Sequence, residues 1–299
     1  MTRAGASMAG RAALASVCVA CSLLALKAYA AWRTGSVAML GSLADSGLDL
    51  LASVITLYGV RMAAQPADHG HRFGHGKAEA LAALFQVALI AVSATAICIQ
   101  AAGRLGAATV IVRAEYGIGV SMVAIGLTLA LVAYQRRVLR LSRSVAIRTD
   151  NLHYESDLYL NLAVIAALAL DQWAGITGAD AVFGIGIALW LLRGAWTAGH
   201  AAIGQLMDQE WPEEKRQRFL AVASRHPELK GIHDLRTRTS GAHDFVQFHV
   251  WVDPKMTVAH AHQVMDEIEA SLMKEFPGTE VLIHPDPEGH TDPPLGHGG

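Results

Sequence analysis

Two pairs of side chains have the type and the spacing needed to bind a metal ion together. Asp45 and Asp49 are four residues apart in one apolar segment, and His153 and Asp157 are four residues apart in another. This spacing places both members of a pair on the same face of a helix. If the two faces met, they would offer one imidazole and three carboxylates, a ligand set that Zn²⁺ accepts in tetrahedral geometry. The sequence therefore predicts a divalent-metal site between two helices.

The cost of placing these carboxylates in apolar segments indicates that the site is functional. In a membrane each Asp near a helix centre costs about 2.5–3.5 kcal/mol, so three cost roughly 8–10 kcal/mol. A metal ion or protons can offset this cost, and both compete for the same ligand atoms. The alternative is that the polar side chains only hold helices together. We expect that structural role for Asn151 and Glu155, which lie on a different face from His153 and Asp157.

A loop that contains several glycines offers a second candidate metal site. Asp68, His71 and His75 form an Asp-x-x-His-x-x-x-His pattern between the second and third apolar segments. Carboxylate oxygen and imidazole nitrogen are both ligands that zinc takes in proteins. A solvated hinge without metal is the alternative interpretation of this loop.

Six apolar segments could carry the paired side chains across a membrane. A bilayer-spanning helix needs about 20 mostly apolar residues. Segments that reach or approach this length lie at roughly 12–32, 36–62, 79–103, 115–135, 146–170 and 179–203. The two pairs fall in the second and fifth of them. A secretory signal is the alternative for the first segment, because Ala28-Tyr29-Ala30 resembles a cleavage site.

The distribution of charge predicts the orientation of these spans. With the N-terminus in the cytoplasm, ten Lys and Arg fall in or beside the cytoplasmic connections and three on the opposite side. Because positive residues concentrate on the cytoplasmic side, both termini are predicted to be cytoplasmic. The formal net charge of −2 gives no sign of the basic face that nucleic-acid-binding proteins need. We therefore exclude nucleic acid as a partner.

After residue 207 the pattern changes to that of a water-soluble domain. Pro212-Glu213-Glu214 is typical of a helix start, and residues 243–252 alternate between apolar and polar positions as a strand does. Further strands are predicted at 231–238 and 279–284. Between them, apolar residues recur at helical spacing at Val258, Ala261, Met265, Ile268, Leu272 and Phe276. The order helix, strand, strand, helix, strand predicts a small α+β domain.

Taken together, these residues and motifs resemble the cation diffusion facilitator family, in particular its bacterial zinc and ferrous-iron efflux members. The resemblance covers nearly the whole chain and includes the loop from Asp68 to Lys77. It implies a six-helix transmembrane transport domain at 1–207 and a cytoplasmic metal-binding dimerisation domain at 208–287, with the αββαβ order of a ferredoxin-like fold. Residues 288–299 are expected to form a disordered tail.

The resemblance also implies three metal sites and one charge pair. The implied transport site is Asp45, Asp49, His153 and Asp157, and the implied loop site is Asp68, His71 and His75. Lys77 and Asp208 match a charge pair at the family's dimer contact. Pro285 stands where some members carry a metal-binding side chain, so one or two metals remain possible in the cytoplasmic domain. The implied regulatory site of that domain is His233, His249, His284 and Asp286, with His262 nearby.

The expected function is therefore export of Zn²⁺ from the cytoplasm in exchange for protons, by alternating access. The protein is expected to be a homodimer that crosses the bacterial inner (plasma) membrane several times. Fe²⁺, Cd²⁺ or Mn²⁺ are alternative substrates. A membrane metal sensor that binds without transporting is an alternative of a different class. An enzyme is not expected, because no His-Glu-x-x-His or comparable motif accompanies the ligands.

Overall fold

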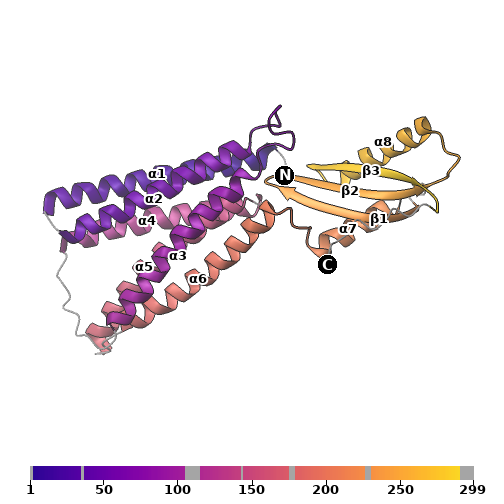
Figure 1. The fold of residues 1–299 in the computed structure, drawn as a ribbon. Coiled ribbons are helices and arrows are strands. Elements are labelled where there is room, and N and C mark those ends of the chain that lie inside the picture. Colours follow the sequence, from indigo (N-terminus) through magenta and orange to yellow (C-terminus); the bar gives the residue numbers. More distant parts are fainter. Residues whose placement is uncertain are drawn as a thin grey trace.

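The computed structural model describes residues 3–34, 37–104, 115–142, 144–174, 179–225 and 230–289. In these parts of the chain, six long helices form an elongated bundle, and a small C-terminal domain lies at one end of it (Figure 1). Each long helix covers one of the six predicted spans, so this part of the fold prediction is confirmed. The long helices are α1 (Arg3–Thr34), α2 (Val37–Ala63), α3 (Ala78–Arg104), α4 (Glu115–Leu139), α5 (Val145–Ala174) and α6 (Ala179–Leu206).

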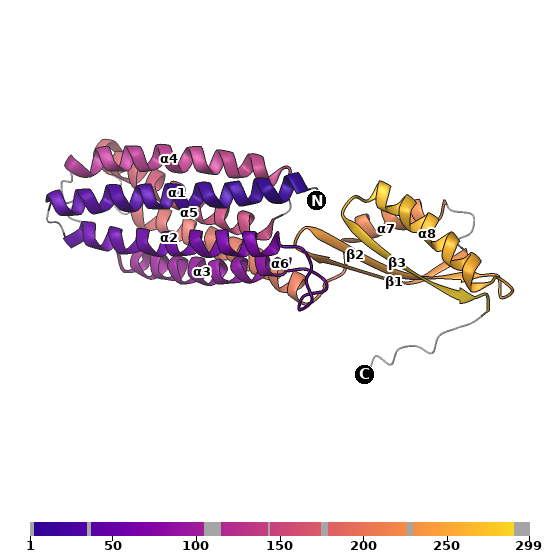
Figure 2. The ribbon, with the colours of Figure 1, turned by 90° about the horizontal axis from the view of Figure 1, so that it is seen from above.

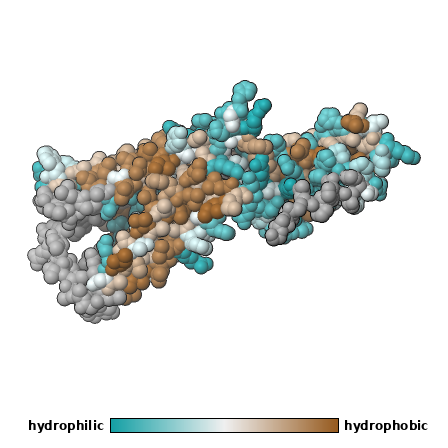
Figure 3. Space-filling model, in the orientation of Figure 1, coloured by the Kyte–Doolittle hydropathy of each residue, from teal (hydrophilic) through white to brown (hydrophobic). Residues whose placement is uncertain are grey.

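The surface of the bundle is suited to a lipid bilayer. Among the described residues, four helices have stretches long and apolar enough to cross a membrane, within α1, α3, α4 and α6. The other two, α2 and α5, carry the two pairs of candidate metal ligands, but their 27 and 30 residues still extend about 40 and 45 Å. Hydrophobic residues cover much of the bundle surface, whereas hydrophilic residues dominate the C-terminal domain (Figure 3).

The chain enters and leaves the bundle on the same side. Both the start of α1 and the end of α6 lie next to the C-terminal domain (Figure 2). Helices α3 and α6 run side by side and diverge from α1, α2 and α4 toward the far end of the bundle (Figure 1). Small residues such as Ala80, Ala83 and Ala202 are buried where α3 packs against α6, and they allow close approach of helices in a membrane.

The C-terminal domain has the predicted αββαβ order. It consists of α7 (Glu213–Ala223), β1 (Lys230–Ser240), β2 (His243–Val252), α8 (Val258–Glu275) and β3 (Thr279–Pro287). The sheet has the order β1-β2-β3, with β1 antiparallel and β3 parallel to the central β2. Both helices lie on one face of the sheet (Figure 2). The other face is left free to carry polar side chains from all three strands.

The alternation predicted for β2 produces the core of this domain. Val246, Phe248 and Val250 are buried against α7 and α8, in a cluster with Phe219 and Leu272. Burying such side chains stabilises the fold by about 1.5–3 kcal/mol each.

The first residue of the apolar pattern that predicted α8 does not join the core. Val258 is 87% exposed, because it is the first residue of α8 and directly follows the N-cap Thr257. The apolar face of the helix therefore begins at Ala261, one turn later.

The loop between α2 and α3 packs against the β1–β2 hairpin. Phe73 meets Phe245 edge-on, with 5.7 Å between the ring centroids, and the guanidinium of Arg238 lies over both rings. Gly76 has no room for a side chain, since a Cβ there would lie 2.2 Å from the carbonyl oxygen of Ser240. These contacts join the helical bundle to the C-terminal domain within one chain.

Candidate metal centres

The first cluster of metal-binding side chains lies near the middle of α2, where α2 meets α5. Nε2 of His153 is 3.0 Å from Oδ1 of Asp49 and 3.9 Å from Oδ2 of Asp157. One ligand atom from each of the three residues lies within 4.8 Å of the other two. Tetrahedral ligands about 2.0–2.1 Å from zinc are about 3.3 Å apart. The three side chains are therefore already spaced for one small divalent ion.

Asp45, the fourth ligand that the sequence predicts, lies outside this group of three. It sits one turn before Asp49 on α2 and is exposed. Lys27 of α1 donates a hydrogen bond of 2.7 Å to Oγ of Ser46, next to Asp45. Both Lys27 and Asp45 lie close enough to Asp157 to act on its charge. The structure thus brings together three of the four predicted ligands and places a cation beside them.

A buried carboxylate that the sequence analysis did not single out lies one turn before His153 on α5. The side chain of Asp150 is fully buried. Its two oxygens accept hydrogen bonds of 2.5 Å from Oγ of Ser16, 2.7 Å from Nε2 of Gln86 and 2.7 Å from Nε2 of Gln135. The donors belong to α1, α3 and α4. Asp150 therefore ties three helices to α5, the helix that carries His153.

The two side chains expected to hold helices together do so. Nδ2 of Asn151 donates to Oε1 of Gln135 at 3.1 Å, and Oε1 of Glu155 lies 2.8 Å from Nε of Arg136. Both partners lie on α4. The prediction that these residues lie on a different face of α5 from His153 and have a structural role is confirmed.

The second cluster lies in the loop between α2 and α3. Oδ1 of Asp68 is 3.3 Å from Nδ1 of His71, and Oδ2 is 3.4 Å from Nε2 of His75. These separations match those of tetrahedral zinc ligands. The backbone N–H of His71 and that of Gly70 donate to Asp68 and lower its pKa, so the carboxylate is held in the charged form that binds metal. His75 is buried, and its Nδ1 has no hydrogen-bond partner among the described residues.

The third cluster lies on the free face of the C-terminal sheet and draws on all three strands. Oδ2 of Asp286 on β3 accepts from Nδ1 of His249 at 2.9 Å and from Nε2 of His233 at 3.2 Å. Its other oxygen lies 3.2 Å from Nε2 of His284. Burial opposes the charge of Asp286, but the hydrogen bond from His249 and the nearby imidazoles lower its pKa overall. The register brings His249 opposite both His233 and His284.

One other predicted residue of the C-terminal domain, His262, does not join this third cluster. His262 lies on α8, is 76% exposed and pairs with Asp266 at 3.6 Å. Pro285 pairs with Val250 inside the sheet and offers no side-chain ligand.

The predicted charge pair does form, but within one chain. Nζ of Lys77 lies 3.1 Å from Oδ2 of Asp208, which has a left-handed backbone with φ of 55° after the end of α6. Nζ of Lys77 also donates to the carbonyl oxygen of Leu206. The pair therefore fixes the exit of α6 against the start of α3.

Comparison with known proteins identifies the family. A profile of the cation efflux transmembrane domain matches residues 13–207, and a profile of the cation efflux protein cytoplasmic domain matches residues 211–288. The chain belongs to the cation efflux family. It is 40% identical over 287 residues to the Cation-efflux pump FieF of Klebsiella pneumoniae (strain 342), covering 96% of this chain and 95% of that protein. It is 43% identical over 276 residues to the protein of the same name from Yersinia pestis (strain Pestoides F), covering 92% of each.

Solved structures similar to this chain cover only part of it. The metal-bound C-terminal domain of the CzcD transporter from Thermotoga maritima is 28% identical, with a TM-score of 0.26, and covers 27% of this chain and 100% of that chain. The zinc form of CzrB is 34% identical, with a TM-score of 0.27, and covers 29% of this chain and 99% of that chain.

Membership of the cation efflux family decides the broad class of the protein. It is a multi-pass membrane transporter with a cytoplasmic C-terminal domain and is not an enzyme. The family resemblance and the fold class that the sequence analysis gave are confirmed.

Asp150 and its hydrogen-bond partners were missed because no local pattern marks them. Ser16, Gln86 and Gln135 lie in three other segments, each of which reads on its own as an ordinary apolar span.

Proposed function

We propose that this protein exports Zn²⁺ from the cytoplasm in exchange for protons. The observation that carries the proposal is the cluster of Asp49, His153 and Asp157 inside the helical bundle, whose ligand atoms lie within 4.8 Å of one another. A mixed set of imidazole and carboxylate suits zinc and, less well, harder ions. The relatives named as cation-efflux pumps support the direction of transport.

The exchange follows from competition at one set of atoms. Metal binds when His153 is neutral and the two aspartates are ionised, so a proton and a metal ion exclude each other there. Facing the cytoplasm, the cluster takes up metal and releases protons, and facing outward it does the reverse. The membrane potential adds about 2.3 kcal/mol per net charge moved per 100 mV, so the number of protons exchanged sets the driving force.

Asp45 is proposed as the ligand that completes the set during this cycle. It is one helical turn from Asp49, on the same face of α2, and it already acts on the charge of Asp157. A small rotation of α2 relative to α5 would add its carboxylate to the group.

The two clusters outside the bundle are proposed to bind regulatory metal. The loop cluster of Asp68, His71 and His75 and the sheet cluster around Asp286 both have ligand atoms at suitable spacing. In this proposal residues 1–207 carry out transport, and residues 208–287 sense cytoplasmic metal and dimerise. The matching cytoplasmic-domain profile carries the name ZT_dimer, which favours a homodimer. We further propose that the dimer lies in a bacterial inner membrane with both termini in the cytoplasm.

Metal flux into sealed proteoliposomes tests this proposal against the alternatives. Purified protein is reconstituted, and Zn²⁺, Fe²⁺, Cd²⁺ and Mn²⁺ are offered separately with an acidic interior. Zinc accumulation that needs the pH gradient supports the proposal. Binding of zinc without flux would instead identify a membrane metal sensor, and faster flux of another ion would reassign the substrate.

A further inference from the structure

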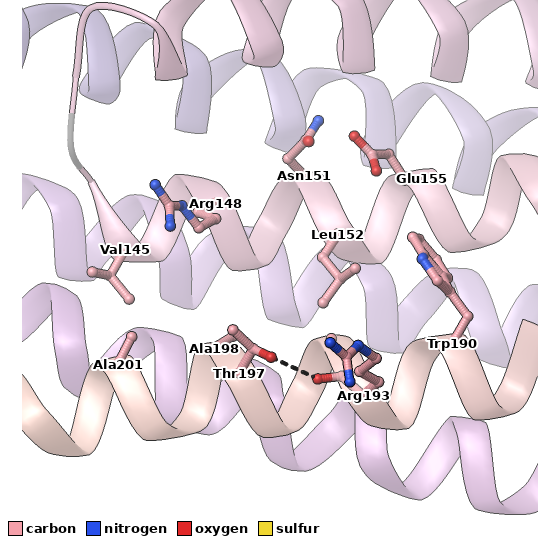
Figure 4. Close-up of a pocket in the computed structure, with 11 residues that line it drawn as sticks. Val145, Arg148, Asn151, Leu152, Glu155, Trp190, Arg193, Thr197, Ala198 and Ala201 are labelled. Atoms are coloured by element: carbon pink, nitrogen blue, oxygen red, sulfur yellow. Dashed lines mark hydrogen bonds between the residues drawn. The ribbon is translucent and has the colours of Figure 1, made fainter.

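A groove of about 360 Å³ runs between α5 and α6 and belongs to none of the three metal clusters. Its walls are mostly apolar, with Leu152, Trp190 and Ala198 among them, but Arg148 and Arg193 also line it (Figure 4). The groove therefore combines an apolar lining with two guanidinium groups. That combination is unusual in a part of the chain that lies in a bilayer.

In the part of the chain that the structure describes, no acidic side chain pairs with either arginine. Arg148 and Arg193 are both exposed, and neither has an ion-pair partner among the residues that the structure describes. Glu155 also lines the groove, but its carboxylate lies 2.8 Å from Nε of Arg136, so its charge is already balanced. The groove thus presents about two uncompensated positive charges, which exclude a metal cation and favour an anion.

Arg193 lies below the membrane surface, where an unpaired charge is costly. Measured from Ala179, a hydrocarbon core of about 30 Å takes about 20 residues, so its cytoplasmic boundary falls roughly at Gly199. Arg193 then lies about 9 Å inside the core at 1.5 Å per residue. Arg148 lines the groove at the level of Ala198, close to the boundary (Figure 4). The flexible stem of Arg193 lets its guanidinium extend toward the same level.

We propose that this groove binds the phosphate headgroup of an anionic phospholipid from the cytoplasmic leaflet. Arginine forms paired hydrogen bonds with phosphate, and basic pockets between membrane helices on the cytoplasmic side bind anionic lipid headgroups. The acyl chains lie along Leu152 and Trp190, which a free phosphate ion would leave uncovered. This site is independent of the proposed metal transport.

Native mass spectrometry of the purified full-length protein tests the site. Phosphatidylglycerol (PG) and phosphatidylcholine (PC) are titrated into wild type, Arg148→Gln, Arg193→Gln and the double variant. Arg137→Gln is the matched control, because it removes an equal charge from an exposed position on α4 outside the groove. From the usual contribution of one arginine to anionic-lipid binding, each single variant should bind PG about fivefold more weakly and the double variant about 30-fold.

A charge-preserving variant and a phosphate competition separate a lipid site from a free-anion site. Arg193→Lys, which keeps the charge, should retain most of the PG binding. The proposal is overturned if the double variant binds PG as tightly as the Arg137→Gln control, or if wild type binds PC as tightly as PG. It is also overturned if millimolar inorganic phosphate displaces PG, since the site would then take a free anion. A shift from dimer to monomer with unchanged PG binding would assign the groove to a protomer contact instead.

Discussion

Removing the Asp150 carboxylate should destabilise the helical bundle more than any change to the metal ligands. Three buried donors, on Ser16, Gln86 and Gln135, point at its oxygens at 2.5–2.7 Å. The hydroxyl of Ser16 can still donate to the carbonyl oxygen of Ala12 at 3.1 Å, so Asp150→Ala leaves two of these donors, on Gln86 and Gln135, without this acceptor. A buried donor left without an acceptor costs about 1–3 kcal/mol, so the variant should cost about 2–6 kcal/mol. Asp150→Asn keeps the shape and one acceptor oxygen. The NH2 group of the new side chain cannot accept a hydrogen bond, so about one donor loses its acceptor, and the expected cost is about 1–3 kcal/mol.

Thermal unfolding in detergent, without added zinc, measures this order. Ser22→Ala is the matched control, because Ser22 is exposed on α1 and its hydroxyl donates to the carbonyl oxygen of Cys18 in its own helix. The expected order of midpoints is Ser22→Ala near wild type, then Asp150→Asn, then Asp150→Ala. Equal midpoints for Asp150→Ala and the control would refute the reasoning. Equal midpoints for Asp150→Asn and Asp150→Ala would also refute it, because keeping one acceptor oxygen would then have no effect on stability.

Three further predictions concern the metal clusters and the C-terminal domain. Zinc at 100 times its Kd should stabilise the C-terminal domain by about 2.7 kcal/mol. In the full-length protein, zinc should therefore slow amide hydrogen exchange in β2. The His262→Ala control should keep this zinc-dependent slowing, and the double variant His249→Ala, His284→Ala should lose it. His153→Asp should shift competition flux from zinc toward Mn²⁺ or Fe²⁺, since an all-oxygen set suits harder ions, and unchanged preferences would exclude His153 as a ligand. Burial raises the pKa of Glu269 above its ordinary value of 4.5, although a backbone hydrogen bond from Ile283 lowers it in part. The charged carboxylate is therefore less stable in the folded domain than in the unfolded chain, and its ionisation as the pH rises opposes folding. Glu269→Gln should therefore stabilise the domain at pH 7 and have little effect at pH 4, and an equal gain at both pH values would contradict this.

The elements of the fold could be predicted because their signals are local. The six apolar stretches, the alternation in residues 243–252 and the two i, i+4 pairs of candidate metal ligands each lie within one segment. The pairing of Asp49 with His153 across 104 residues has no such local signal. It was expected because the family resemblance implies one site made of Asp45, Asp49, His153 and Asp157. Helix boundaries agreed within a few residues, except at the N-terminus of α1, where helix continues back to Arg3 beyond the apolar stretch.

Other features depend on contacts that no local pattern reveals. Asp150 lies near the start of α5, two residues after Arg148, and an acidic residue at such a place is common. Its burial comes only from packing against three other helices. Asp45 and Asp49 have the same residue type and share a helix face, yet only Asp49 reaches His153. His262 is close in sequence to the predicted sheet ligands but lies on α8, across the sheet from their face. The tail was predicted at 288–299, and residues 290–299 lie outside the described residues.

The most direct test of the central claim is the coupling of zinc and proton flux at the Asp49, His153 and Asp157 cluster. Sealed proteoliposomes with a zinc indicator and a pH indicator inside report both fluxes at once. Wild type should take up zinc while its acidic interior becomes less acidic, with a fixed ratio of protons to zinc. Asp49→Ala, reconstituted in equal amount and eluting as the same oligomer, should show neither flux. Zinc uptake in Asp49→Ala near the wild-type rate, or wild-type uptake without proton movement, would contradict exchange at this cluster.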